Sequence, residues 1–264
     1  MGIDKLRFRF RKSGDLRFLS HHDLMRAVER LLRRADIPFH SSSGFNPRPR
    51  LVFPLSLPLG VVGLREVMEL ELTEPRDPEA TRSLLQAHAP PGLEFLSACR
   101  IPLERTGQVV QADYRLAIPP DKAGEIADRC LELLARAEVL VERSQPPAPP
   151  KRVDIRPFIL QLGVVSSGDP NDQPESAPSL HLSLRVTPSG SARAQEVIRC
   201  LGAAGILEAG AILERTNLLL LDELPVSDSD IPPTATPAGP GVSPCYEAAV
   251  SPPHAVEPLL KDAP

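Results

Sequence analysis

Residues 5–11 alternate strictly between charged and apolar side chains, as Lys-Leu-Arg-Phe-Arg-Phe-Arg. Because successive side chains of a strand point to opposite faces, this pattern predicts a half-buried strand with a cationic outer face. Apolar residues recur at helical spacing from Ser20 to about Ala35, which predicts a helix. Ser20 followed by Asp23 is typical of a capped helix start, and Pro38 forces the chain out of the helix.

The rest of the first hundred residues continues this alternation. Two apolar runs predict a hairpin over 51–59 and 67–72, and a second helix and a further strand follow over 77–88 and 93–101. The order strand, helix, strand, strand, helix, strand is that of a ferredoxin-like βαββαβ unit. A looser second copy is predicted from strands over 114–118, 139–143, 153–165, 180–186 and 212–221 and helices over 121–137 and 192–204.

These patterns predict an α+β fold of tandem ferredoxin-like units with antiparallel sheets. We expect a basic domain over residues 1–104 and a more degenerate second domain over 105–224. Residues 225–264 differ in composition, with ten prolines and five acidic residues against one lysine. Such a segment buries too little apolar surface to offset the entropy of ordering, so a disordered, proline-rich acidic tail is predicted.

Charge is distributed unevenly along the 264 residues, although the net charge is only −4. Residues 1–50 hold 12 Lys and Arg against 5 Asp and Glu, a net charge of +7. The remaining residues hold 18 against 29, a net charge of −11. The average therefore hides a basic N-terminal segment, which changes the expected class of partner.

Several protein classes are not indicated. No apolar run approaches the roughly 18 residues of a membrane-spanning helix, and the N-terminus is not that of a signal peptide. The four cysteines are widely spaced and give neither a zinc motif nor a disulfide framework, which is typical of the reducing cytoplasm. No standard catalytic or cofactor motif is present. We therefore expect a cytoplasmic protein with no metal, no cofactor and no membrane partner.

The basic residues of the predicted strand, helix and following loop are candidates for one phosphate-binding surface. Arginine forks suit phosphate oxygens, and three neighbouring elements carry the same sign of charge. Phe8 and Phe10 are expected on the face opposite the arginines, so phosphates of structured RNA fit better than stacked bases. The predicted RNA-binding residues are Lys5, Arg7, Arg9, Arg11, Arg17, Arg26, Arg30, Arg48 and Arg50. A solvated charged face is the alternative interpretation.

The loop over residues 43–50 combines a flexible glycine with a stiff Pro-x-Pro segment. Its Ser43, Gly44, Phe45 and Asn46 are candidates to offer backbone N–H groups and a side-chain amide to a phosphate or small ligand. The alternative is a connecting loop with fixed backbone angles, in which Phe45 is held in the core.

His21 and His22 begin the predicted first helix. A histidine among arginines is a candidate general acid or base for cleavage of RNA, and His21 would be the catalytic residue of such a nuclease. The alternative, which we favour, is that one ring completes the helix start while the other faces solvent, since no second catalytic group is evident.

Two segments carry a family resemblance. Arg17-Phe18-Leu19-Ser20-His21-His22-Asp23-Leu24, and Ser43-Gly44-Phe45-Asn46-Pro47-Arg48-Pro49 followed by Pro58-Leu59-Gly60, resemble signatures of the bacterial radical SAM-linked protein family. The resemblance covers roughly residues 4–220, and its first 70 residues are the most specific. At His22 the family pattern usually has a leucine, which argues against a paired-histidine mechanism.

The resemblance implies a genomic and biochemical context. Members of this family of unknown function occur beside, or fused to, radical SAM proteins with a cobalamin-binding region. This chain has no C-x-x-x-C-x-x-C motif for an iron–sulfur cluster, so it is not itself the radical enzyme. The tandem ferredoxin-like order is also similar to that of repeat-associated RNA endonucleases of CRISPR systems, which is an analogy of fold.

Together these observations predict a non-catalytic accessory module that binds structured RNA, such as tRNA or rRNA, and presents it to a radical SAM partner. One alternative is a metal-independent endoribonuclease that uses His21. Another is a protein-only adaptor that docks on the radical SAM partner without RNA.

Overall fold

The first half of the chain forms an antiparallel sheet covered by two helices. The computed structural model describes residues 3–43, 45, 47–145, 147–165 and 177–224. Its first elements are β1 (Asp4–Lys12), α1 (His21–Arg34), β2 (Leu51–Val52), β3 (Val62–Leu72), α2 (Pro78–His88) and β4 (Leu93–Arg100), with a short 3-10 turn over Gly14–Phe18. Strand β1 pairs with β3 and β4, and β2 pairs with β3, so the order is β2-β3-β1-β4 with all pairs antiparallel.

The side chains of β1 alternate between the two faces of the sheet, and the apolar ones lie on the inner face as predicted. Leu6, Phe8 and Phe10 are buried in a core that α1 and α2 complete. The ring of Phe8 meets that of Phe95 edge to face, with centroids 6.0 Å apart. The apolar stripe of α1 contributes Leu24, Val28, Leu31 and Leu32 to the same core. The first unit is thus built by burying one face of its sheet under two helices.

Helix α1 begins where the sequence predicts. The Ser20 hydroxyl accepts a hydrogen bond from the backbone N–H of Asp23 at 3.2 Å, which satisfies one of the free donors of the first turn. The helix ends at Arg34, just before Asp36 takes a left-handed φ of 49°. Helix α2 likewise begins after Asp77, whose carboxylate accepts from Ala80 N–H at 2.7 Å.

The second half repeats the arrangement with an insertion. Its elements are β5 (Val109–Ala117), α3 (Ala123–Ala135), β6 (Leu140–Gln145), β7 (Ala148–Asp154), β8 (Ile159–Val165), β9 (Ser179–Thr187), β10 (Gly190–Ser191), α4 (Ala194–Cys200), α5 (Ala204–Glu208) and β11 (Leu213–Leu220), with 3-10 turns over Pro120–Lys122, Arg156–Phe158 and Leu221–Glu223. The strand order is β8-β9-β5-β11, and all these pairs are antiparallel. Strands β6 and β7 pair only with each other in the described chain.

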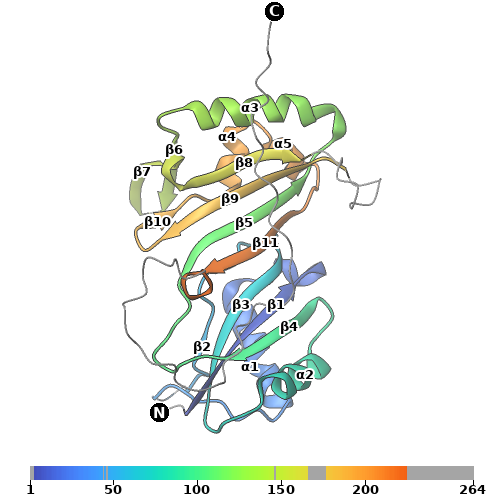
Figure 1. The fold of residues 1–264 in the computed structure, drawn as a ribbon, viewed down its shortest axis with the longest axis vertical. Helices are drawn as coiled ribbons and strands as arrows, with labels where there is room; N and C mark the ends of the chain where they lie inside the picture. The colour runs from blue at the N-terminus through green and yellow to red at the C-terminus, as the bar shows by residue number, and fades with distance from the viewer. Residues whose placement is uncertain (1–2, 44, 46, 146, 166–176, 225–264) are drawn as a thin grey trace, which may run out of the picture.

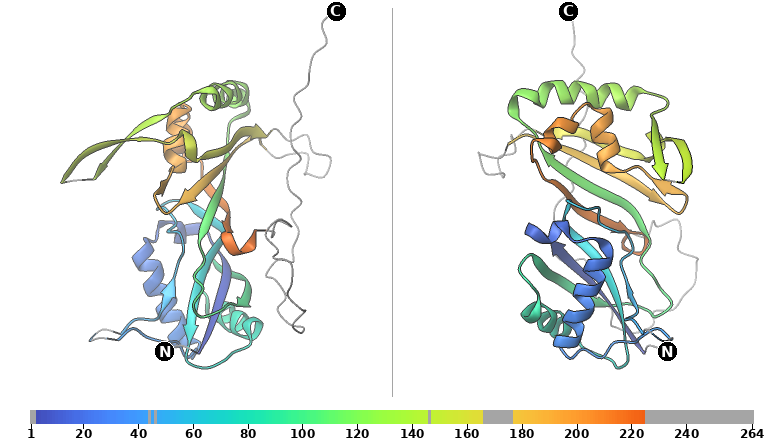
Figure 2. Two further views of the ribbon diagram at one scale, coloured as in Figure 1. Left: turned by 60° about the vertical axis from the view of Figure 1, so that its left-hand side comes forward. Right: turned by 180° about the vertical axis from the view of Figure 1, so that it is seen from behind.

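The two halves share one sheet. Strand β11 runs parallel to the start of β3, with Glu214 opposite Val62 and Arg215 opposite Gly63. This contact makes a nine-stranded sheet within the described residues, which runs through the molecule from β10 to β4 (Figure 1). Seen from behind, α1 lies over the first half of the sheet, and α4 and α5 lie over the second (Figure 2). The predicted α+β fold with a mostly antiparallel sheet is confirmed.

Several predicted elements differ in extent. The strand predicted over 51–59 is only two residues long, because Pro54 and Pro58 cannot donate to a ladder. The strand predicted over 139–143 joins a separate hairpin, β6–β7, and the one predicted over 153–165 is broken by the 3-10 turn at Arg156–Phe158. The helix predicted over 192–204 is interrupted, and α5 starts only at Ala204. The predicted tail, 225–264, lies outside the described residues.

Candidate nucleic-acid interface

The charged face of β1 is buried, not exposed. Lys5, Arg7 and Arg9 are 3%, 4% and 5% exposed, so the expectation of a cationic outer surface on this strand is wrong. Lys12, the last residue of the strand, is 1% exposed. Arg11 alone on this face is open to solvent, and it pairs with Glu94 of β4 at 2.9 Å. The strand therefore contributes little free positive charge to the surface.

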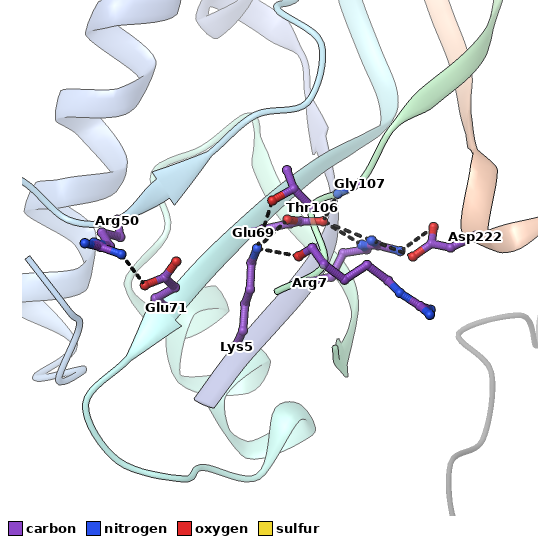
Figure 3. Close-up of polar contacts among 9 residues, drawn as sticks. Lys5, Arg7, Arg50, Glu69, Glu71, Thr106, Gly107 and Asp222 are labelled. Carbon is purple, nitrogen blue, oxygen red and sulfur yellow. Dashed lines mark hydrogen bonds and ion pairs between the residues drawn. The ribbon is translucent and has the colours of Figure 1, made fainter. Parts of the chain in front are cut away.

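Acidic residues from distant parts of the chain neutralise this face. The Arg7 guanidinium donates from Nε to Glu69 Oε1 at 3.0 Å and forms two hydrogen bonds with the Asp222 carboxylate, at 3.1 and 2.9 Å. Lys5 Nζ donates to the carbonyl of Arg105 at 2.6 Å and lies 3.1 Å from Glu69 Oε2 (Figure 3). Burial opposes the charge of Arg7, but Asp222 and Glu69 raise its pKa above the ordinary value.

The same network fixes the connection between the two halves. Gly107 N–H donates to Glu69 Oε1 at 2.8 Å, and a Cβ at position 107 would itself lie 2.8 Å from this oxygen. A side chain at position 107 would therefore require the Glu69 carboxylate to shift. Arg9 pairs with Glu223 and donates to the carbonyl of Leu218 at 2.8 Å. Burial lowers the pKa of Arg9, and this outweighs the opposing effect of Glu223.

A second buried ionic cluster lies beside the junction of β11 and β3. Arg215 is 1% exposed, forms two hydrogen bonds with Glu66, and donates to the carbonyls of Ser56 and Leu55, each at 3.1 Å. Burial opposes this charge, but Glu66 raises the pKa of Arg215 above the ordinary value. Lys12 donates to the carbonyl of Leu19 at 2.8 Å, and burial lowers its pKa. These cations hold the fold together and are not available to a partner.

His21 stands at the edge of this cluster. Its ring packs edge to face against Phe53, with centroids 5.6 Å apart, and against His22 at 5.8 Å. It lines a small enclosed cavity together with Lys12 and Glu66, with room for about one water molecule. Burial, His22 and Lys12 lower the pKa of His21, so the ring is neutral at pH 7. The arrangement is that of a packed helix start, with His22 exposed to solvent.

Exposed arginines of the first unit lie on α1 and in the segment before β2. Arg26, on α1, is 66% exposed, with Asp23 at 3.5 Å, and Arg30 is exposed one turn further along. Arg50 is 48% exposed and pairs loosely with Glu71 at 3.4 Å (Figure 3), and Arg48 is exposed nearby. Within the described chain, neither Arg30 nor Arg48 has an ion-pair partner. These four side chains are the part of the predicted surface that is free to meet phosphate.

A short hairpin presents Arg48 and Arg50. Ser41 pairs with Pro49, Ser42 N–H donates to the carbonyl of Arg48 at 2.8 Å, and Arg50 N–H donates to that of His40 at 2.8 Å. Ser43 is exposed, and Phe45 is fully exposed, so the alternative in which Phe45 enters the core is wrong. Gly44 and Asn46 lie outside the described residues. Arg17 is half-buried, because its guanidinium lies 4.3 Å from the centre of the Phe18 ring.

The comparison with known families identifies the chain only broadly. A family model described as "Uncharacterized protein conserved in bacteria (DUF2344)" matches residues 5–194. The chain belongs to this family. A search of curated proteins finds no match.

The family match runs from β1 to the start of α4, so it covers the first unit and the second unit as far as β10. No cluster of three or more His, Cys, Asp or Glu side chains among the described residues is arranged to hold a metal ion. No helix among them is long and apolar enough to cross a membrane.

The structure adds basic residues that the sequence did not single out. Lys151 and Arg152 are exposed on β7, and Arg193, just before α4, is 69% exposed. In the left view of Figure 2, the β6–β7 hairpin projects on the same side of the molecule as α1. The signal in the sequence was a Pro-Pro-Lys-Arg segment, which has neither a strand nor a helix period.

Proposed function

We propose that this protein is a non-catalytic module that binds structured RNA and presents it to a radical SAM partner. The observation that carries the proposal is the separation of charges. The cations of β1 are neutralised inside by Glu69, Asp222 and Glu223, whereas Arg26 and Arg30 of α1 and Arg48 and Arg50 before β2 remain exposed. Arginines held on a helix and a hairpin suit the fixed phosphate spacing of folded RNA.

The experiment is filter binding of labelled tRNA and rRNA fragments over a series of salt concentrations. The variant replaces Arg26, Arg30, Arg48 and Arg50 by Gln, and the control is Arg115→Gln. Arg115 is also exposed, but it alternates with the buried Tyr114 and Leu116 on β5 and so lies on the opposite face of the sheet. We expect the fourfold variant to lose binding and the control to keep it.

The proposal fails if the unmodified protein binds no more tightly than the non-specific range of roughly 10⁻⁴ to 10⁻⁶ M at physiological salt. Unchanged binding by the fourfold variant would also contradict it.

The partner assignment rests on the family resemblance of the two signature segments. Co-purification with the neighbouring radical SAM protein, before and after nuclease treatment, separates the possibilities. A complex that requires RNA supports presentation of RNA, whereas a nuclease-resistant complex in a protein that binds no RNA favours the protein-only adaptor. We also propose a cytoplasmic location, on the wide spacing of the four cysteines in the sequence.

The endoribonuclease alternative has less support. The His21 ring packs against Phe53 and lines the same small cavity as Lys12, and burial lowers its pKa. Incubation of labelled RNA with the protein and with His21→Ala, in chelator, tests it directly. Cleavage that the substitution abolishes would replace the non-catalytic proposal.

We also infer that each half is a ferredoxin-like unit. The observation in favour is that β2-β3-β1-β4 and β8-β9-β5-β11 have equivalent orders, with a helix after the first strand of each half and helical segments before the last. Tandem units of this kind give one long sheet with the helices of both units available to a single partner (Figure 2).

A further inference from the structure

The hairpin formed by β6 and β7, residues 140–154, is a projecting arm. It pairs with no strand of the large sheet within the described chain, and it extends away from the second unit (Figures 1 and 2). Residues 148–152 of β7 are all exposed. An isolated two-stranded ribbon is at best marginally stable in water, so an arm of this kind needs an anchor or a partner.

The arm is anchored at its base and at Arg143, midway along β6. Arg143 donates to both carboxylate oxygens of Glu196, at 2.8 and 2.7 Å, and to the carbonyl of Ser191 at 2.7 Å. Burial opposes the charge of Glu196, but Arg143 and Arg193 lower its pKa below the ordinary value. Val139 N–H donates to Asp154 at 2.8 Å and closes the base of the ribbon. The position of the arm is therefore fixed, while its outer part stays open.

Strand β7 carries exposed positive charge at the level of this anchor. Lys151 lies directly opposite Arg143, which is paired with Glu196, and Arg152 lies opposite Glu142. Neither Lys151 nor Arg152 has an ion-pair partner among the described residues. Arg193 adds a further exposed cation next to the base of the arm.

The side chains of the arm suit contacts with the sugar-phosphate backbone of a nucleic acid. Residues 140–154 include no aromatic side chain, so they offer nothing on which an unpaired base would stack. Its seven-residue strand β7 spans roughly 23 Å at about 3.3 Å per residue, a reach comparable to the width of a nucleic-acid helix. Double-stranded RNA is recognised mainly by shape and by contacts to phosphates and 2′-hydroxyls.

We infer that the arm contacts the phosphate backbone of a double-stranded RNA segment whose other side lies against the arginines of α1. This inference rests on the proposed RNA-binding function and assigns the form of RNA. The arm and the hairpin that carries Arg48 and Arg50 project on the same side as α1 (Figure 2, left). Cations held in fixed positions at both ends of this face can contact the fixed phosphates of a rigid duplex. A flexible single strand would lose more conformational entropy in making the same contacts.

The test compares a 20-base-pair RNA duplex with one of its strands alone, by filter binding across a salt series. The variant is Lys151→Gln with Arg152→Gln, two exposed changes that leave the anchor Arg143–Glu196 intact. The matched control is Arg115→Gln with Arg185→Gln, which removes the same charge from the opposite face of the sheet. Thermal unfolding of both variants checks that each is folded.

We expect the arm variant to lose affinity for the duplex, with its salt slope reduced by about 1.8 for two lost phosphate contacts. Binding of the single strand and both affinities of the control should stay unchanged. An arm variant that binds the duplex as before, or that loses duplex and single strand equally, overturns the inference but leaves RNA binding intact. A parent protein that binds neither RNA overturns the proposed function itself.

Discussion

Arg7 of β1 forms a two-point ion pair with Asp222, which follows it by 215 residues, with distances of 3.1 and 2.9 Å. The pair joins the first strand to the 3-10 turn that ends the described chain. The basic face of β1, which the sequence predicts to bind nucleic acid, is therefore an internal contact between the two halves. The basic segment of the sequence thus has two different physical roles.

Replacement of Arg7 by Ala should destabilise the protein by about 3 kcal/mol, the low end for a broken buried ion pair, because the fully buried Glu69 would lose one cationic partner and keep Lys5. Urea unfolding monitored by circular dichroism measures this change. Arg11→Ala is the control on the same strand, since its pair with Glu94 is open to solvent and should contribute at most about 1 kcal/mol. Equal losses for both variants would show that the Arg7 network is not a buried structural contact.

The pair formed by Arg215 and Glu66 should behave as a unit. Arg215→Met alone leaves a buried carboxylate without its partner and should cost about 3–5 kcal/mol in the free energy of unfolding. The additional substitution Glu66→Leu removes the unpaired carboxylate and should restore part of the lost free energy of unfolding. A double-mutant cycle in urea gives the coupling. Additive effects of the two substitutions would contradict the direct interaction.

His21 should make stability depend on pH. Its pKa lies below the ordinary value of 6.5, so the unfolded state takes up a proton at a higher pH than the folded state does. The free energy of unfolding therefore falls as pH decreases through the ordinary value toward the lower folded pKa. His21→Gln should flatten this part of the profile, measured by urea unfolding between pH 7.5 and about 5.

His181 provides the comparison for this profile, because burial, together with Arg115, lowers its pKa as well. His181→Gln should remove a separate part of the pH dependence. If the profile of His21→Gln matches that of the parent protein, the packed, neutral state of His21 is wrong.

The exposed arginines should set the salt dependence of RNA binding. Each phosphate contact contributes about 0.9 to the slope of log Kobs against log salt on a duplex. Single substitutions Arg30→Gln and Arg48→Gln should each lower this slope by about that amount, with similar effects on all sequences. Arg9→Gln should alter stability and leave the slope of the remaining folded protein unchanged, since Arg9 is bonded to Glu223 inside the molecule.

The local patterns of the sequence determined the local structure well. Strict alternation over residues 5–11 predicted β1 and the burial of Phe8, and the helical stripe with Ser20 at its start predicted α1. Such patterns succeed because side-chain period depends only on the neighbouring backbone. Proline-containing runs were less predictable, and the strand expected over 51–59 contracted to β2.

What covers the second face of β1 was decided only by tertiary structure. A period of two indicates two faces, but it does not tell whether solvent or another segment lies on the polar one. Here β11 pairs in parallel beside β3, and this brings Asp222 and Glu223 onto Arg7 and Arg9. Long-range pairing depends on the packing of the whole chain, so the sequence by itself located the positive charge, and only the fold separated its buried part from its exposed part.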